Sequence, residues 1–180
     1  MPELWLDITD IPATGREFSF SDLGLWTGPI KEFELPHRLE DTGAPVHASF
    51  SVAPQNRGVL IRGRIDGVIV TPCDRCAEET RVAVGSDFEL FEELPLEEEQ
   101  SLEPGLLRRR GKVVELDVAS MLWEQFLLAL PVKPLCADDC PGLCPLCGAN
   151  LRNGPCGCTQ DEGDPRLAVF RTLKAPRGSN

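Results

Sequence analysis

The residues best suited to chemistry are cysteines, and six of the eight lie within residues 136–158, CADDCPGLCPLCGANLRNGPCGC. Thiolate sulfur is a strong zinc ligand, and a CxxC turn presents two sulfurs to one ion because its backbone curls around the metal. The stretch CPLCG has this form, and CGC follows it after an eight-residue loop. The sequence therefore predicts a structural Zn²⁺ site with four ligands: Cys144, Cys147, Cys156 and Cys158.

Two further cysteines of the segment, Cys136 and Cys140, are also candidate metal ligands. They could replace one pair of the predicted site, form a second site with Cys73 and Cys76, or remain free thiols. Eight cysteines would fill two tetrahedral sites, but spacing alone cannot bring residue 73 beside residue 136. The sequence leaves open which four cysteines share an ion.

Rival uses of these thiols are disulfides, iron sites and redox chemistry. The N-terminus MPELWLDITD has no secretory pattern and no apolar run is long enough for a membrane span, so we expect a cytoplasmic protein, where clustered cysteines bind metal more often than they form disulfides. CPLCG resembles the iron-binding knuckle of rubredoxins, which use two CxxC pairs, whereas only a CxC follows here, so zinc is favoured. The motif Cys73-Asp74-Arg75-Cys76 lacks the strand-to-helix setting of thioredoxin-like motifs, which favours a structural or metal role.

No catalytic constellation accompanies the cysteines. The sequence has no Ser-His-Asp order, phosphate loop or HExxH motif, and His37 and His47 are expected to be surface residues. A zinc ion enclosed by four thiolates has no open position for water. We therefore expect a protein that is not an enzyme and has no small-molecule substrate.

The elements that must position the cysteines begin with three runs of alternating apolar and polar residues, 47–52, 58–70 and 80–94. Such alternation is typical of strands with one wet face, and three runs in order predict an antiparallel meander. Cys73 and Cys76 would then lie at the hairpin connection between the second and third strands.

A helix is predicted from Asp117 to Leu130, with Asp117 as N-cap and Pro131 ending it. Its apolar stripe is expected to be core. A second helix is predicted over residues 164–174. The expected class is α+β, an antiparallel sheet core followed by a helix, a Cys-rich zinc knuckle and a short C-terminal helix. The predicted units are 1–130 (β-rich core with packed helix), 131–163 (metal-binding segment) and 164–180 (C-terminal helix and tail).

The chain carries a formal net charge of −11, which disfavours broad binding to nucleic acid or anionic lipid. Residues 94–113 combine an acidic run with an arginine triplet and are expected to form a solvated loop. The alternative is that the triplet contacts RNA or a protein partner. Candidate contact residues are Arg108, Arg109, Arg110, Arg166, Arg171, Lys174 and Arg177.

The ordered motifs resemble one family. CDRC after a strand, ELDVASMLWEQFLLALPVKPLC, DDCPGLCPLCGANL and a closing DPRLAVFRTLK are similar to the YceD family, bacterial and plastid proteins named for large-subunit ribosomal RNA accumulation. The similarity runs from about residue 45 to 174. It implies a role in synthesis, processing or stability of this RNA, with no known catalytic step. Some family members lack the C-terminal cysteine cluster, which implies that the cluster reinforces structure.

Two functions follow from these observations. The first is a non-enzymatic ribosome-biogenesis factor that binds a ribosomal protein or a large-subunit rRNA precursor, with the acidic chain favouring a cationic protein at least as much as RNA. The alternative is a thiol redox protein or iron-binding electron-transfer protein that uses CDRC or the cysteine cluster.

Overall fold

The computed structural model describes residues 3–22, 24–39, 45–95 and 105–158. Within these ranges the chain forms two antiparallel sheets and two α-helices, which confirms the predicted α+β class. The predicted helix over residues 164–174 lies outside the described residues, as do Arg166, Arg171, Lys174 and Arg177.

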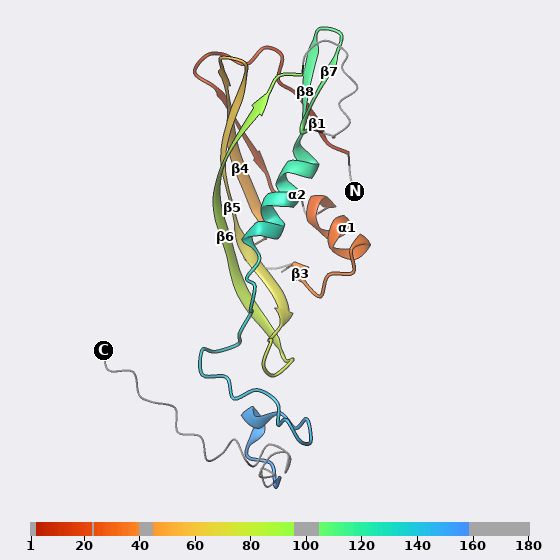
Figure 1. The fold of residues 1–180 in the computed structure, drawn as a ribbon, viewed down its shortest axis with the longest axis vertical. Helices are drawn as coiled ribbons and strands as arrows, with labels where there is room; N and C mark the ends of the chain where they lie inside the picture. The colour runs from red at the N-terminus through yellow and green to blue at the C-terminus, as the bar shows by residue number, and fades with distance from the viewer. Residues whose placement is uncertain (1–2, 23, 40–44, 96–104, 159–180) are drawn as a thin grey trace, which may run out of the picture.

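The main sheet is built around a long hairpin (Figure 1). β5 (Gly58–Pro72) and β6 (Glu79–Glu93) pair antiparallel over their whole length. β4 (His47–Gln55) pairs with the first part of β5, so the predicted meander is confirmed. β2 (Arg16–Phe20) pairs with β4, and the short β3 (Arg38–Leu39) pairs with the later part of β5.

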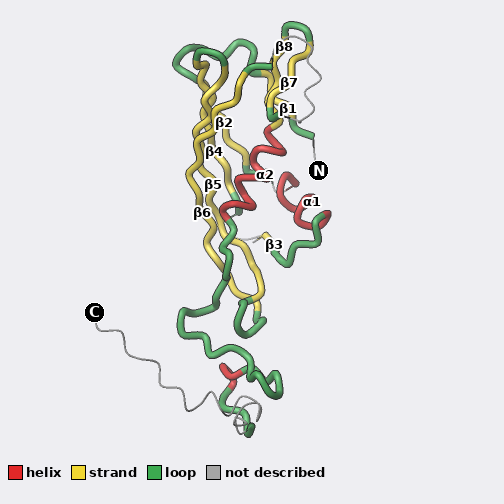
Figure 2. Tube along the Cα trace, viewed as in Figure 1, coloured by secondary structure: helices red, strands yellow, loops and turns green. Residues whose placement is uncertain are grey.

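The alternation along the strands separates a buried face of this sheet from an exposed one. On β5, Ile61 and Ile65 are fully buried, whereas Arg62 and Arg64 between and beside them are exposed. Phe50 of β4 is also on the buried face, 3% exposed. Both helices lie on one side of this sheet, as Figure 2 shows, and the buried side chains of the strands form one core with those of the helices.

The second sheet joins the N-terminus to the residues before the long helix. Its order is β1 (Trp5–Asp7), β8 (Val113–Asp117) and β7 (Leu107–Arg110). The expectation of a solvated loop over residues 94–113 is wrong for β7, because the chain there pairs with β8. Gly111, at φ 61°, permits the tight turn between these two strands.

The predicted helix is present as α2 (Val118–Ala129). It begins after Asp117, whose carboxylate accepts a hydrogen bond from the Ser120 amide at 3.0 Å, as expected of an N-cap. The apolar stripe is core: Val118, Leu122 and Phe126 are fully buried. In the described residues no helix is long and apolar enough to cross a membrane.

A second helix, α1 (Gly24–Glu32), was not predicted from the sequence. Pro29 and two glycines lower its helix propensity, so tertiary packing must stabilise it. That packing comes from Trp26, which is fully buried. The centroid of its ring lies 5.3 Å from the ring centroid of Phe126 in α2.

Candidate metal centres

The β5–β6 hairpin extends beyond the helices, and its tip meets the segment that follows α2 (Figure 1). Backbone hydrogen bonds hold the two together: the Asp74 amide donates to the Pro134 carbonyl at 2.9 Å, and the Leu143 amide donates to the Arg75 carbonyl at 3.0 Å. The connection between β5 and β6 contains Cys73 and Cys76, as predicted. Two segments far apart in the sequence therefore bring their cysteines to one place.

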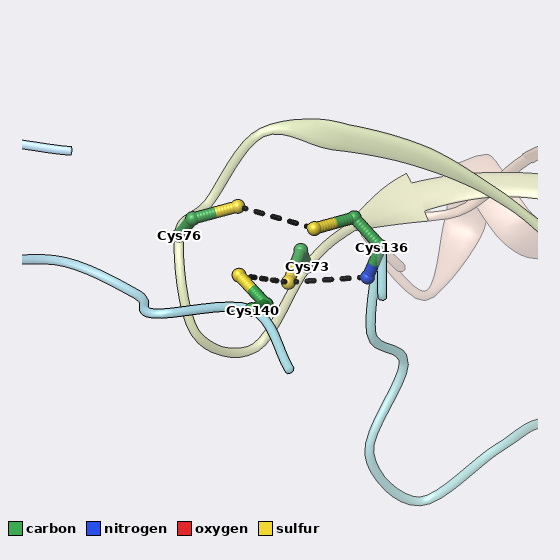
Figure 3. A group of neighbouring side chains, drawn as sticks. All are labelled: Cys73, Cys76, Cys136 and Cys140. Atoms are coloured by element: carbon green, nitrogen blue, oxygen red, sulfur yellow. Dashed lines mark hydrogen bonds between the residues drawn. The ribbon is translucent and has the colours of Figure 1, made fainter. Parts of the chain in front are cut away.

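Four of these cysteines form a group that we call the hairpin cluster: Cys73, Cys76, Cys136 and Cys140. Their Sγ atoms all lie within 4.8 Å of one another. Each hairpin sulfur faces a sulfur of the other segment (Figure 3): Cys73 Sγ lies 3.9 Å from Cys140 Sγ, and Cys76 Sγ lies 3.7 Å from Cys136 Sγ. Cys73, Cys76 and Cys140 are at most 4% exposed.

The other four cysteines form the terminal cluster: Cys144, Cys147, Cys156 and Cys158. Their sulfurs also lie within 4.8 Å of one another, so the four residues predicted as one site are brought together. Cys144 is buried, whereas Cys147 and Cys158 are exposed. The terminal cluster is therefore the more accessible of the two to solvent.

Backbone amides favour the thiolate form of the first cysteine in each cluster. Burial raises the pKa of Cys73, but the amides of Arg75, Cys76 and Cys136 donate to its sulfur and lower that pKa to about 6. The amides of Cys147 and Leu146 lower the pKa of Cys144 to about 6 in the same way.

A second cysteine in each cluster resists ionisation in the absence of a cation. Burial and the neighbouring cysteine side chains raise the pKa of Cys136 to about 12. Hydrogen bonding with Cys147, together with burial, raises the pKa of Cys158 to about 12. A cation held among the sulfurs would supply the positive charge that full ionisation of four thiols requires.

The arginine of the CDRC motif, Arg75, makes hydrogen bonds that connect the two segments. Its Nη1 donates to the backbone carbonyls of Asp138 and Cys140, both at 3.0 Å. These bonds fix the turn that carries Cys140 against the hairpin tip. The motif thus contains two thiols and a positioning residue for a third, a role that spacing alone did not indicate.

A second arginine was missed by the sequence reading. Arg152 lies in the loop between Cys147 and Cys156, yet its Nη1 donates to Cys136 Sγ of the hairpin cluster at 3.3 Å. The loop is fixed nearby by Asn150, whose side chain donates to Glu78 Oε1 at 3.1 Å. Nothing in the local sequence marks Arg152, because its target lies in another cluster.

The remaining candidate residues lie outside the two clusters. His37 is half-buried, and its Nδ1 lies 2.9 Å from Thr71 Oγ1, while His47 is in β4. Arg108 is paired with Glu115 and lies 3.5 Å above the Trp5 ring. No histidine belongs to either cysteine group of the described chain.

Comparisons with known proteins find several relatives of this chain. An uncharacterized protein of Mycobacterium tuberculosis is 32% identical over 76% of this chain and 65% of its own length. The Arabidopsis thaliana protein named Large ribosomal RNA subunit accumulation protein YCED homolog 1, chloroplastic, is 26% identical over 73% of this chain and 49% of its own length. The chain thus covers from half to just under two-thirds of these relatives. No solved structure has significant similarity to it.

A family model also matches the chain. It is described as Large ribosomal RNA subunit accumulation protein YceD, and it matches residues 61–174. That range begins within β5 and includes both cysteine clusters and α2. Since the match covers more than half of the sequence, the chain belongs to the YceD family of large ribosomal RNA subunit accumulation proteins.

Proposed function

We propose that the protein is a non-enzymatic factor that supports synthesis, processing or stability of large-subunit ribosomal RNA, with structural zinc in its terminal cluster. The observation that carries this proposal is the family match over residues 61–174, together with the rRNA accumulation named in the Arabidopsis relative. Its proposed location is the cytoplasm.

The chemistry of the cysteines supports a structural role. Each cluster offers four thiol sulfurs at mutual distances that one ion can span. Zinc bound by four thiolates has no coordination position left for water. In the terminal cluster the four ligands would be Cys144, Cys147, Cys156 and Cys158. The ion would supply cross-linking of the segment that follows α2.

Surface charge favours a cationic protein as the partner. The chain carries a net charge of −11. On the main sheet, Arg62 and Arg64 already pair with Glu89 and Asp87, so their charges are partly neutralised by carboxylates. Ribosomal proteins are strongly basic, and an acidic surface attracts them over long range. The proposed partner is therefore a ribosomal protein of the large-subunit precursor.

The role in the cell is tested by deleting the gene and sedimenting the lysate. We expect fewer large subunits, less large-subunit rRNA and an accumulation of precursor particles, all restored by the wild-type gene. Unchanged particle profiles and RNA levels would overturn the proposal. Crosslinking followed by purification tests the partner: a ribosomal protein is expected, and ribosomal RNA recovered without any ribosomal protein would contradict that choice.

The zinc role is tested by Cys144→Ser or Cys147→Ser. A structural zinc site contributes on the order of 10 kcal/mol to local folding, so either variant should lose protection of residues 144–158, which hold the terminal cluster, while the main sheet persists. Limited proteolysis and hydrogen exchange measure this loss. Val132→Ser is a matched control, because Val132 is fully exposed and lies in the chain between α2 and the cysteines. Native-like protection in both cysteine variants would refute the role.

A metal analysis of the same preparation separates zinc from the alternative of iron-based electron transfer. Thiolate knuckles bind iron as well as zinc, but an iron site is coloured and reducible. A colourless protein with stoichiometric zinc is the expected result. Visible absorption that disappears on reduction would favour the alternative.

A further inference from the structure

We propose that the hairpin cluster is a second site for a thiophilic divalent cation such as Zn²⁺, so that the chain binds two ions, and that Arg152 links the two sites. The second site extends the thiol-metal chemistry proposed above, but it does not depend on the ribosomal role. Its ligands would be Cys73, Cys76, Cys136 and Cys140.

The first argument is the spacing of the sulfurs. Four sulfurs at about 2.3 Å from a tetrahedral zinc lie about 3.8 Å from one another. The two measured Sγ–Sγ distances across the hairpin cluster are 3.9 Å for Cys73 and Cys140 and 3.7 Å for Cys76 and Cys136. A disulfide requires about 2.05 Å. The cluster therefore has the dimensions of a metal site and not of two disulfides.

The second argument is that both clusters use the same backbone turn. In the hairpin cluster the Ala77 amide donates to the Cys73 carbonyl at 2.9 Å, and Ala77 has φ 59°. In the terminal cluster the Gly148 amide donates to the Cys144 carbonyl at 2.9 Å, and Gly148 has φ 71°. In each turn the amides two and three residues after the first cysteine donate to its sulfur.

The left-handed conformation at Ala77 strengthens the comparison between the two turns. A residue with a Cβ costs about 1–2 kcal/mol in this region, whereas glycine at position 148 adopts it readily. The hairpin tip thus keeps a strained backbone that closes the turn around Cys73 and Cys76. A bound cation contacting both sulfurs would stabilise that turn.

The third argument is charge. Four thiolates around one dication leave a net charge of −2, which in a buried cluster needs compensation. Arg152 supplies one of the two positive charges, because its guanidinium donates to Cys136 Sγ at 3.3 Å and also interacts electrostatically with Cys76 and Cys140. Hydrogen bonds from such outer partners orient metal ligands and tune their affinity.

The position of Arg152 connects the two sites. It belongs to the loop between Cys147 and Cys156, which an ion in the terminal cluster would order. The Arg152 amide donates to Asn150 Oδ1 at 3.0 Å, and Asn150 also bonds to Glu78 of the hairpin. Loading of the terminal cluster would therefore present Arg152 to Cys136 and slow release of the hairpin ion.

Native mass spectrometry of the full chain, reduced and saturated with Zn²⁺ alone, tests the second site. We expect two ions per wild-type chain and one in each of Cys76→Ser and Cys147→Ser. One ion in the wild type, or two in Cys76→Ser, overturns the second site. One wild-type ion that is kept by Cys76→Ser and lost by Cys147→Ser would overturn this inference while leaving the proposed terminal zinc intact.

Release of zinc to a chromogenic chelator tests the link. Arg152→Ala should still bind two ions but should release one of them about 10-fold faster, the usual scale for loss of an outer-shell partner. Arg152→Lys should recover part of the effect because it keeps the charge. The matched control is Arg57→Ala, an exposed arginine in the β4–β5 turn, which should behave as wild type.

A double variant distinguishes coupling from a local structural effect. With Cys147→Ser the terminal ion is absent, so Arg152 should no longer be held at Cys136, and Arg152→Ala should then change release of the remaining ion by less than in the wild-type background. Equal effects in both backgrounds, or no effect of Arg152→Ala in the wild type, would overturn the link.

Discussion

Replacing Gly63 with alanine should destabilise the protein, although alanine is usually more favourable than glycine inside a strand. Gly63 lies in the middle of β5, with Phe50 of β4 and Phe88 of β6 as its partners on either side. A Cβ built there would lie 2.7 Å from Phe50 Cβ and 2.7 Å from the Ser49 carbonyl oxygen, and closer still to the Phe88 ring. The carbonyl belongs to the sheet backbone, so it cannot turn aside as a flexible side chain can.

The magnitude follows from two opposing effects. Alanine in an open strand position is more stable than glycine by about 0.5–1 kcal/mol, because glycine loses more backbone freedom on folding. Overpacking a buried site costs about 1–3 kcal/mol. Since both Phe50 and Phe88 are at most 9% exposed, the second effect dominates, and we expect Gly63→Ala to lower the unfolding free energy by about 1–2 kcal/mol.

Urea unfolding at a fixed excess of zinc measures this loss, and the midpoint should fall by about 0.5–1 M. The matched control is Gly85→Ala in β6 of the same hairpin, where a Cβ would meet only Arg64 Nη2 at 3.8 Å and the Ile65 carbonyl oxygen at 3.9 Å. This control should gain about 0.5–1 kcal/mol. Equal stabilisation by both substitutions would refute the reasoning.

Three further predictions concern the sheet edge, the helix start and the hairpin turn. Partial burial lowers the pKa of His37 below its ordinary 6.5. The contribution of His37 to stability should therefore be full above pH 6.5 and decrease as the pH falls from there towards the lower pKa of the folded state. The unfolding free energies of wild type and His37→Gln, measured across this pH range, give the difference, and parallel curves would contradict the prediction. Asp117→Ala should lower stability by about 1 kcal/mol because the Ser120 amide loses its acceptor, as thermal unfolding would show, and an unchanged midpoint would count against the cap. Ala77→Gly should relieve the left-handed strain and stabilise the hairpin turn by about 1 kcal/mol, seen as slower zinc release; faster release would oppose this account.

Much of the fold could be predicted because its signals are local. Alternation in residues 47–94 marked β4, β5 and β6, and the Asp117 cap with its apolar stripe marked α2. The elements that were missed have weak local signals. α1 contains Pro29 and is stabilised by Trp26 packing on α2, and β7 consists largely of exposed arginines that pair with β8.

Of the two cysteine clusters, one could be predicted from local sequence and the other could not. The CPLCG knuckle and the CGC pair are close in sequence, so their ligand types and spacing were enough to predict the terminal cluster. By contrast, Cys73 and Cys76 stand more than fifty residues before Cys136, and no local pattern states which segment will lie beside a hairpin tip. Only the pairing of β5 with β6 and the return of the chain after α2 decide that.

What the sequence alone determined was therefore the chemistry available: thiol ligands, an acidic surface, alternating strands and a capped helix. The tertiary structure decided how the ligands are grouped, with Cys136 and Cys140 joined to the hairpin and Arg152 of one cluster bonded to a sulfur of the other. The physical reason is that side-chain type and short spacing are properties of a segment, whereas a metal site between two segments depends on the packing that brings them together.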